Sequence, residues 1–171
     1  MGVTVHFEGK LRDERAYAQL LSDATDFAAG KGWPAERFLI AHTTLKRVRE
    51  EKDWDYTGPT KGVELRPHPS SEPLRLEFDQ DFYIQEYIKT QFAPIEVHKE
   101  IAVLLRKLSS YFTIFEVFDE GEYYETEDES LLVKHRDSCF KVLDENLAND
   151  SALRGPVRLP SGRIADLVRD P

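Results

Sequence analysis

The residues of this chain that are best suited to chemistry are carboxylates crowded into one stretch. Eight of the thirty-two acidic residues lie between Glu116 and Glu129, and no Lys or Arg occurs from Leu108 to Val133. Like charges this close together oppose folding unless they serve turns, a cation or a basic partner. Because aromatic and apolar residues are interspersed among the acids, we expect the stretch to be folded and strongly electronegative.

A β-hairpin with its two-residue turn at Glu120–Gly121 is the fold that this stretch suggests. Such a hairpin places Glu116 opposite Glu125, while Phe118 faces Tyr123. Directly opposed side chains have Cβ atoms about 4.5–5.5 Å apart, so two carboxylates there could hold a hard cation, or one could serve as a general acid. The alternative is a solvated hairpin whose acids lead into a helix N-terminus. The spacing does not fit a calcium-binding loop.

Histidines on neighbouring predicted strands offer a second kind of site. Together with a carboxylate they could bind zinc or another divalent ion. The candidate metal ligands are His6, His42, His68 and Glu116. No two of the histidines have a local metal-binding spacing such as HxH or HExxH, so each ligand would come from a different segment. The alternative is a polar outer face of the sheet that binds nothing.

Exposed aromatic residues beside the acids favour recognition of a partner. Trp54 lies in a charged loop, and exposed Trp is enriched in the residues that dominate binding energies. The candidate binding residues are Glu116, Phe118, Glu120, Glu122, Tyr123, Glu125 and Trp54. A dense aromatic group around residues 78–92 could line a pocket, although aromatic residues at this density more often form the core.

No complete catalytic or cofactor-binding motif occurs. The sequence contains no GxSxG, no phosphate-binding loop and no GxGxxG fingerprint. The single cysteine, Cys139, excludes an internal disulfide and a zinc site built from several thiolates. We therefore expect no cofactor, with a divalent cation as the one candidate.

The overall charge restricts the partners. A formal net charge of -9 argues against binding to nucleic acid or to an anionic membrane surface. The apolar runs are too short to span a bilayer, and the first residues lack the pattern of a signal peptide. We therefore expect a cytoplasmic protein, monomeric or homodimeric, that interacts with a basic protein or a small molecule.

The hydrophobic pattern predicts alternating strands and helices. Residues 3–7 alternate as a half-buried strand, and Asp13 is a plausible N-cap for a helix that ends at Gly30 or Gly32. Further strands are predicted around residues 38–48, 63–66, 74–79 and from 114, and residues 81–92 fit a strand or a short helix. A second helix is predicted to follow Pro94. Thr126 and Glu129 form a capping box that opens a third.

This order of elements predicts an α+β fold. We expect a single domain over residues 1–150, with a largely antiparallel sheet of about 5–7 strands and about three amphipathic helices packed on one face. Residues 151–171, which contain Pro and Arg, are predicted to form a disordered tail or a strap across the acidic hairpin, either of the same chain or of a partner subunit. The other face of the sheet is left partly open.

Three functions follow from these patterns. The first is a non-catalytic binding or regulatory domain that engages a basic partner or small ligand through its acidic and aromatic surface. The second is a metal-assisted, hydrolase-like enzyme that uses His and carboxylates on the open face of the sheet. The third is mimicry of nucleic acid by the acidic surface.

Overall fold

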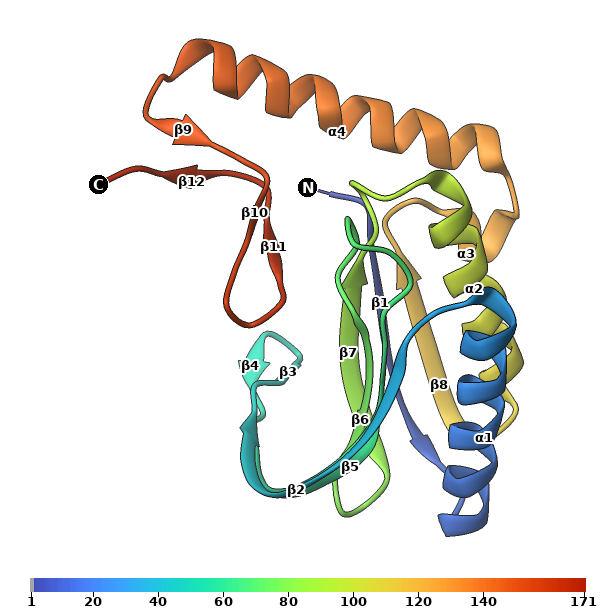
Figure 1. The fold of residues 1–171 in the computed structure, drawn as a ribbon. Helices are drawn as coiled ribbons and strands as arrows, with labels where there is room; N and C mark the ends of the chain where they lie inside the picture. Colours follow the sequence, from blue (N-terminus) through green and yellow to red (C-terminus); the bar gives the residue numbers. More distant parts are fainter. Residues whose placement is uncertain (1) are drawn as a thin grey trace.

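Two three-stranded antiparallel sheets form the body of the protein, with strand orders β7-β1-β8 and β2-β5-β6 (Figure 1). The computed structural model describes residues 2–171. The four helices are α1 (Glu14–Lys31), α2 (Ile95–Ser109), α3 (Tyr123–Thr126) and α4 (Glu129–Asn149). The strands of the two sheets are β1 (Thr4–Leu11), β2 (Ala35–Leu45), β5 (Tyr56–Leu65), β6 (Leu74–Phe78), β7 (Tyr83–Lys89) and β8 (Phe112–Asp119). The predicted α+β fold with antiparallel sheets is confirmed.

The core lies between the sheets and the first two helices. Val5 and Phe7 of β1 are buried, and they belong to one hydrophobic cluster with Leu20 of α1 and Leu105 of α2. The alternate residues of β1 point to the opposite face. There His6 and Glu8 are only partly buried, because no helix covers that side of the β7-β1-β8 sheet (Figure 1).

Helix α1 begins and ends where its sequence signals predict. The Asp13 side chain accepts a hydrogen bond of 2.8 Å from the Ala16 N–H, which satisfies one of the free donors of the first turn. At the other end Gly32 has φ 71° and donates to carbonyls of the last turn. Glycine adopts this left-handed conformation without the strain that a Cβ would bring.

At two other places the structure decides between alternatives or corrects the prediction. Residues 81–92, which fitted a strand or a helix, contain the strand β7. The capping box is wrong, because Thr126 is the last residue of α3. The N-cap of α4 is Asp128, whose side chain accepts from the N–H groups of Ser130 and Leu131 at 2.9 and 3.2 Å.

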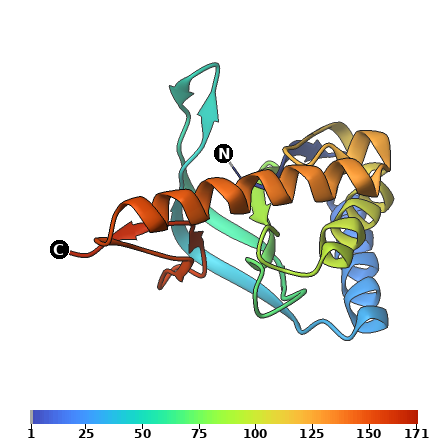
Figure 2. The same cartoon turned by 90° about the horizontal axis from the view of Figure 1, so that it is seen from above.

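Strands β2 and β5 curve away from the helices and carry a small hairpin, β3 (Val48–Arg49) and β4 (Lys52–Asp53). In Figure 2 this hairpin projects from the body of the molecule. A hydrogen bond connects this hairpin to the open face: the Val48 N–H donates to the Gln85 side chain at 2.9 Å. Because β2 and β5 curve in this way, they form a wall beside the open face of the β7-β1-β8 sheet.

Helix α4 and the last segment close the upper end of the open face (Figures 1 and 2). Leu132 and Cys139 of α4 pack with Val3 in a second, smaller hydrophobic cluster. After α4, residues 151–171 contain four short strands, which pair as β9 with β12 and β10 with β11. These strands are β9 (Leu153–Arg154), β10 (Val157–Arg158), β11 (Ile164–Ala165) and β12 (Val168–Arg169). Among the described residues, no helix is long and apolar enough to cross a membrane.

Candidate functional site

A cleft of about 830 Å³ lies on the open face of the β7-β1-β8 sheet. Its floor is formed by outward-pointing side chains of the three strands. Its walls come from residues 46–48, from Asp53 and Asp55 near the β3–β4 hairpin, and from Arg163. Ligand sites are typically clefts of about 300–1,000 Å³ that combine apolar surface with a few polar groups. This cleft is therefore the candidate site.

An aromatic row, made of Tyr87, His6 and Phe118, crosses the floor of the cleft. The register of the sheet places His6 of β1 directly between Tyr87 of β7 and Phe118 of β8. The His6 ring centroid lies 5.6 Å from that of Tyr87 and 5.9 Å from that of Phe118. Phe118 is 66% exposed, so its ring is available to a ligand.

An acidic row, made of Gln85, Glu8 and Glu116, lies next to the aromatic row. Glu8 is two residues further along β1 than His6, and it is paired with Gln85 on one side and with Glu116 on the other. Directly paired residues on one face have Cβ atoms about 4.5–5.5 Å apart, where like charges are destabilising. The two carboxylates are thus held near each other by the backbone rather than by mutual attraction.

The two carboxylates of the acidic row have different surroundings. Glu8 accepts hydrogen bonds from the Tyr83 hydroxyl and from the Gln85 amide, the latter at 3.1 Å. Burial, followed by this bond to Glu8, raises the pKa of Tyr83 to about 12, so its hydroxyl remains a donor. Glu116 is exposed, and among residues 2–171 its carboxylate has no hydrogen-bond or ion-pair partner. It is the group left to contact a ligand.

Basic side chains at the wall of the cleft are already paired. The Lys46 ammonium lies 2.5 Å from Asp55. Arg47 is buried, forms an ion pair of 2.8 Å with Asp79, and lies 4.9 Å from the centroid of the Tyr83 ring. Because these charges are neutralised within the protein, they do not cancel the acidic row.

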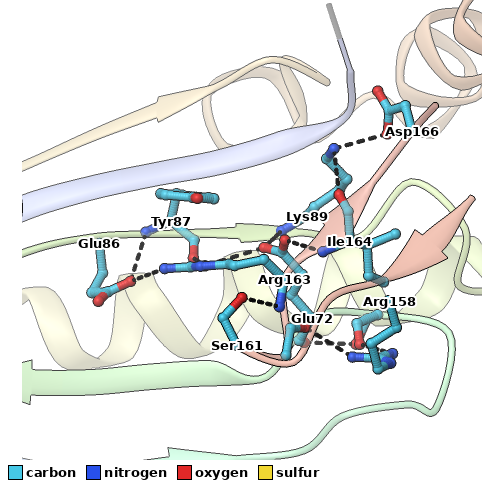
Figure 3. Close-up of polar contacts among 11 residues, drawn as sticks. Glu72, Glu86, Tyr87, Lys89, Arg158, Ser161, Arg163, Ile164 and Asp166 are labelled. Atoms are coloured by element: carbon cyan, nitrogen blue, oxygen red, sulfur yellow. Dashed lines mark hydrogen bonds and ion pairs between the residues drawn. The ribbon is translucent and has the colours of Figure 1, made fainter. Parts of the chain in front are cut away.

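Arg163 connects the C-terminal segment to the cleft. Its guanidinium donates to Glu86 at 2.7 Å and to the Tyr87 carbonyl at 2.7 Å, and it reaches Glu72 at 3.2 Å (Figure 3). It also stacks on Tyr87, with its guanidinium carbon 3.7 Å from the ring centroid. Burial raises the pKa of Glu86 despite this guanidinium.

The same contacts bridge the gap between β6 and β7. In the middle of this gap, β7 bonds to side chains: the Tyr87 C=O accepts from Arg163 and the Lys89 N–H donates to Glu72. At its two ends, the Tyr83 and Lys89 C=O groups accept from the backbone N–H groups of Asp79 and Glu72, which flank β6. The bond from the Lys89 N–H to Glu72 is 2.9 Å long, and the Glu72 carboxylate also accepts from the Ile164 N–H at 2.9 Å (Figure 3). The segment therefore lies across β7 and the Glu72 loop, where Arg163 and Glu72 join it to the sheet, and not across an acidic hairpin as predicted.

The acidic stretch does not form the predicted hairpin. Strand β8 ends at Asp119, and the chain continues into α3, so Glu125 does not face Glu116 and Tyr123 does not face Phe118. The cross-strand partner of Glu116 is Glu8. A carboxylate pair exists as the sequence suggested, but it joins β8 to the first strand of the chain.

The remaining candidate binding residues lie outside the lining of the cleft. Glu120 accepts from the Thr4 N–H at 3.0 Å, and Glu122 contacts His135. Tyr123 and Glu125 are in α3. Trp54, beside the β3–β4 hairpin, is covered on one side by Arg49, whose guanidinium carbon lies 3.5 Å from its ring centroid. Of the seven candidates, the cleft brings together Glu116 and Phe118.

The structure does not bring the four candidate metal ligands together. His6 and Glu116 line the cleft, while His42 lies in β2 and His68 follows β5. Within residues 2–171 no group of three or more His, Cys, Asp or Glu side chains is arranged to hold a metal ion. The expected convergence is wrong because His6 and Glu116 belong to one sheet, while His42 lies in the other sheet and His68 in the loop after β5.

A buried chain of hydrogen bonds elsewhere resembles a catalytic triad but is enclosed. The Thr90 hydroxyl lies 2.7 Å from Nδ1 of His98, whose Nε2 lies 2.9 Å from Asp119. Asp119 also accepts from the N–H groups of Gly121 and Tyr124 at 2.7 and 2.8 Å. All three side chains are buried, so this group holds α2, β8 and α3 together rather than reaching a substrate.

Comparisons with protein-family models, with curated proteins and with solved structures found no match. Sequence reasoning did not select Glu8, Tyr87 or Arg163 as site residues. The alternation in β1 carried a signal for Glu8, which points to the same face as His6. The contact of Arg163 with Tyr87 depends on the path of the chain after α4 and left no local signal.

Proposed function

We propose that this protein is a non-catalytic binding module whose cleft holds a cationic group of a basic partner or small ligand. The observation that carries the proposal is the acidic row beside the aromatic row, with Glu116 exposed and unpaired among the described residues. A cation placed there contacts the face of Phe118 and neutralises the repulsion between Glu8 and Glu116. Aromatic rings and carboxylates are the groups that attract ammonium and guanidinium ions most strongly.

The expected affinity for one cationic group is modest. A cation over an aromatic face contributes about 0.5–2 kcal/mol, and a hydrogen bond to a charged group about 1.5–3 kcal/mol. Their sum supports a Kd of about 1 mM, which corresponds to about 4 kcal/mol. A partner that adds contacts outside the two rows would bind more tightly. Exposed charges are screened by salt, so binding should weaken as ionic strength rises.

A titration with N-acetyl-argininamide, followed by nuclear magnetic resonance, tests this proposal. We expect the backbone signals of His6, Glu116 and Phe118 to shift, and we expect the uncharged analogue N-acetyl-citrullinamide to shift them far less. Glu116→Gln should weaken binding about tenfold or more. Glu125→Gln is the matched control, because it removes a carboxylate of the same acidic stretch that lies outside the cleft.

Two results would overturn the proposal. One is an equal response to the charged and the uncharged probe. The other is undiminished binding by Glu116→Gln, provided that the variant keeps the circular dichroism spectrum of the natural protein.

A further inference from the structure

Strand β8 is an edge of the β7-β1-β8 sheet, and its outer backbone groups are free. The Glu120 N–H donates to the Thr4 carbonyl at 3.0 Å, which fixes the phase of the β1–β8 pairing. In an antiparallel pair the bonded residues alternate, so Glu116 and Phe118 bond to β1. The N–H and C=O groups of Phe115 and Val117 therefore point away from the sheet, and within residues 2–171 their N–H groups have no partner.

This edge also lacks Lys and Pro, two of the features that commonly protect exposed strands, and its one exposed charge is Glu116. Natural edges are commonly protected by Lys, by Pro or by a covering element. Strand β8 contains none of these residues, and no Lys or Arg lies between Leu108 and Val133. On the cleft side, β8 exposes Ile114 and Phe118, each 66% exposed, with Glu116 between them.

We propose that β8 binds an extended basic segment of a partner protein, which adds to the sheet as a further strand. This inference rests on the proposed function, because the basic side chain of the segment would be the cation held by Glu116 and Glu8. Strand addition supplies main-chain hydrogen bonds for affinity, and alternate side chains supply specificity. The segment would pair its N–H and C=O groups with those of Phe115 and Val117.

The register predicts the sequence of the segment. Side chains of an added strand that lie on the cleft side stand opposite Ile114, Glu116 and Phe118 in turn. The complementary pattern is apolar, any residue, Arg or Lys, any residue, apolar. The pattern reads the same in both directions, so it suits a parallel or an antiparallel strand. In an antiparallel strand these positions are the non-hydrogen-bonded pairs, where side chains approach most closely.

Charge favours a basic partner over a second copy of this chain. Antiparallel pairing of β8 with itself about Glu116 would place two Glu116 carboxylates opposite each other. The adjacent registers would place Glu116 opposite Ile114 or Phe118 of the partner copy. The net charge of -9 adds repulsion between two copies.

Fluorescence polarisation with a labelled peptide, Ser-Gly-Val-Thr-Arg-Thr-Val-Gly-Ser, tests the inference. Two control peptides test the positive charge and the backbone hydrogen bonds separately. One replaces Arg by citrulline and removes the charge, and the other is N-methylated on the central Thr-Arg-Thr and loses the strand hydrogen bonds. We expect each control peptide to bind at least tenfold more weakly. Hydrogen exchange at Phe115 and Val117 should slow at least tenfold with the parent peptide, whereas Glu116 and Phe118 are already protected by β1.

The outcomes distinguish this inference from the proposed function. Strand addition is wrong if the N-methylated peptide binds as well as the parent and exchange at Phe115 and Val117 is unchanged. In that case, sensitivity to citrulline and to Glu116→Gln would still support the cation site. Binding that needs the backbone but ignores the charge would refute the cation site. A stable dimer of the unliganded protein in analytical ultracentrifugation, with hydrogen exchange at Phe115 and Val117 already slowed, would show that β8 is used by a second copy, which also overturns the inference.

Discussion

Replacement of Arg163 by Gln should destabilise the protein more than the loss of any other arginine in the C-terminal segment. The guanidinium lies between Glu72 and Glu86, whose side chains are 1% and 13% exposed. Without it, two carboxylates remain in a gap that water reaches poorly. Removal of one partner from a fully buried ion pair costs about 3–5 kcal/mol.

The magnitude here is smaller because Arg163 itself is 27% exposed. Partial screening by water reduces the expected loss to about 2–3 kcal/mol. For a chain of this length, a loss of 1 kcal/mol lowers Tm by about 2–4 °C, so the variant should melt about 4–12 °C below the natural protein. Urea denaturation followed by circular dichroism measures the free energy of unfolding directly.

The loss should also depend on pH. Burial already raises the pKa of Glu86 above its ordinary value of 4.5, and Arg163 opposes that rise. Without Arg163 the pKa rises further, so the folded variant binds a proton more readily than the unfolded chain. Its stability then increases as the pH falls from neutral towards the ordinary carboxyl pKa. The deficit should therefore be largest at pH 7 and above and should shrink near pH 5.

Arg154→Gln is the matched control, since it removes an arginine of the same segment whose ion pair with Asp170 is exposed. Such pairs add little stability, so this variant should unfold almost as the natural protein does. The double variant Glu86→Gln/Arg163→Gln should recover part of the loss, because one of the uncompensated charges is gone. A loss no larger than that of Arg154→Gln, or one that is constant from pH 5 to 8, would refute the reasoning.

Three further predictions concern the rest of the molecule. Gly62→Ala should cost about 3 kcal/mol or more, because a Cβ at Gly62 would lie 1.7 Å from the Leu76 carbonyl oxygen across the β5–β6 pair; urea denaturation measures this. Although burial acts to raise the pKa of Asp119, its bond with His98 lowers it, so stability should fall as the pH drops below the ordinary 3.8. Asp119→Asn should weaken that dependence in acid titrations followed by circular dichroism, and the part that remains comes from other carboxylates with a lowered pKa, such as Asp150. Phe118→Ser should change the free energy of unfolding by no more than about 0.5 kcal/mol, since the ring is mostly exposed, while it weakens peptide binding in the polarisation assay.

Elements with local signals could be predicted from the sequence. Helix α1 has an apolar stripe, an aspartate cap and a terminal glycine, all within a few residues of one another, so its bounds follow from near neighbours. The same holds for β1, where the alternation of residues 3–7 predicted a half-buried strand. Where the residues that stabilise an element are near one another in sequence, the element can be predicted from the sequence alone.

The acidic stretch shows where local reading fails. Glu120–Gly121 looks like a hairpin turn, but Asp119 bonds to the Gly121 and Tyr124 N–H groups and to His98 of α2. That buried network turns the chain into α3 instead of a returning strand. His98 is not a neighbour of Asp119 in sequence, so the residues of the acidic stretch alone do not predict this contact.

The candidate site depended on strand order, which the sequence does not specify. Glu8 and Glu116 are each visible as outward-facing residues, but their pairing requires β1 to lie beside β8. The partner predicted for Glu116 lies within the acidic stretch, because no sequence rule connects β8 to the first strand. The structure pairs Glu116 with the carboxylate of Glu8 and not with that of Glu125.

If the cleft holds a cation as proposed, two arginines of the protein indicate which cation it would prefer. A guanidinium beside an aromatic ring and a carboxylate occurs twice around the site. Arg163 stacks on Tyr87 and pairs with Glu86, and Arg47 lies beside the Tyr83 ring and pairs with Asp79. In both arrangements a planar guanidinium contacts a ring and a carboxylate at once, which an ammonium ion does less well.

A third set of such groups lies at the exposed end of the two rows. Phe118 supplies the ring, Glu116 supplies the carboxylate, and no arginine among residues 2–171 pairs with that carboxylate. The two occupied arrangements use arginines of this chain, so the third calls for an arginine from elsewhere. Exchanging Arg for Lys in the test peptide should therefore weaken binding, although the charge is unchanged. Equal binding of the two peptides would show that the site recognises charge alone.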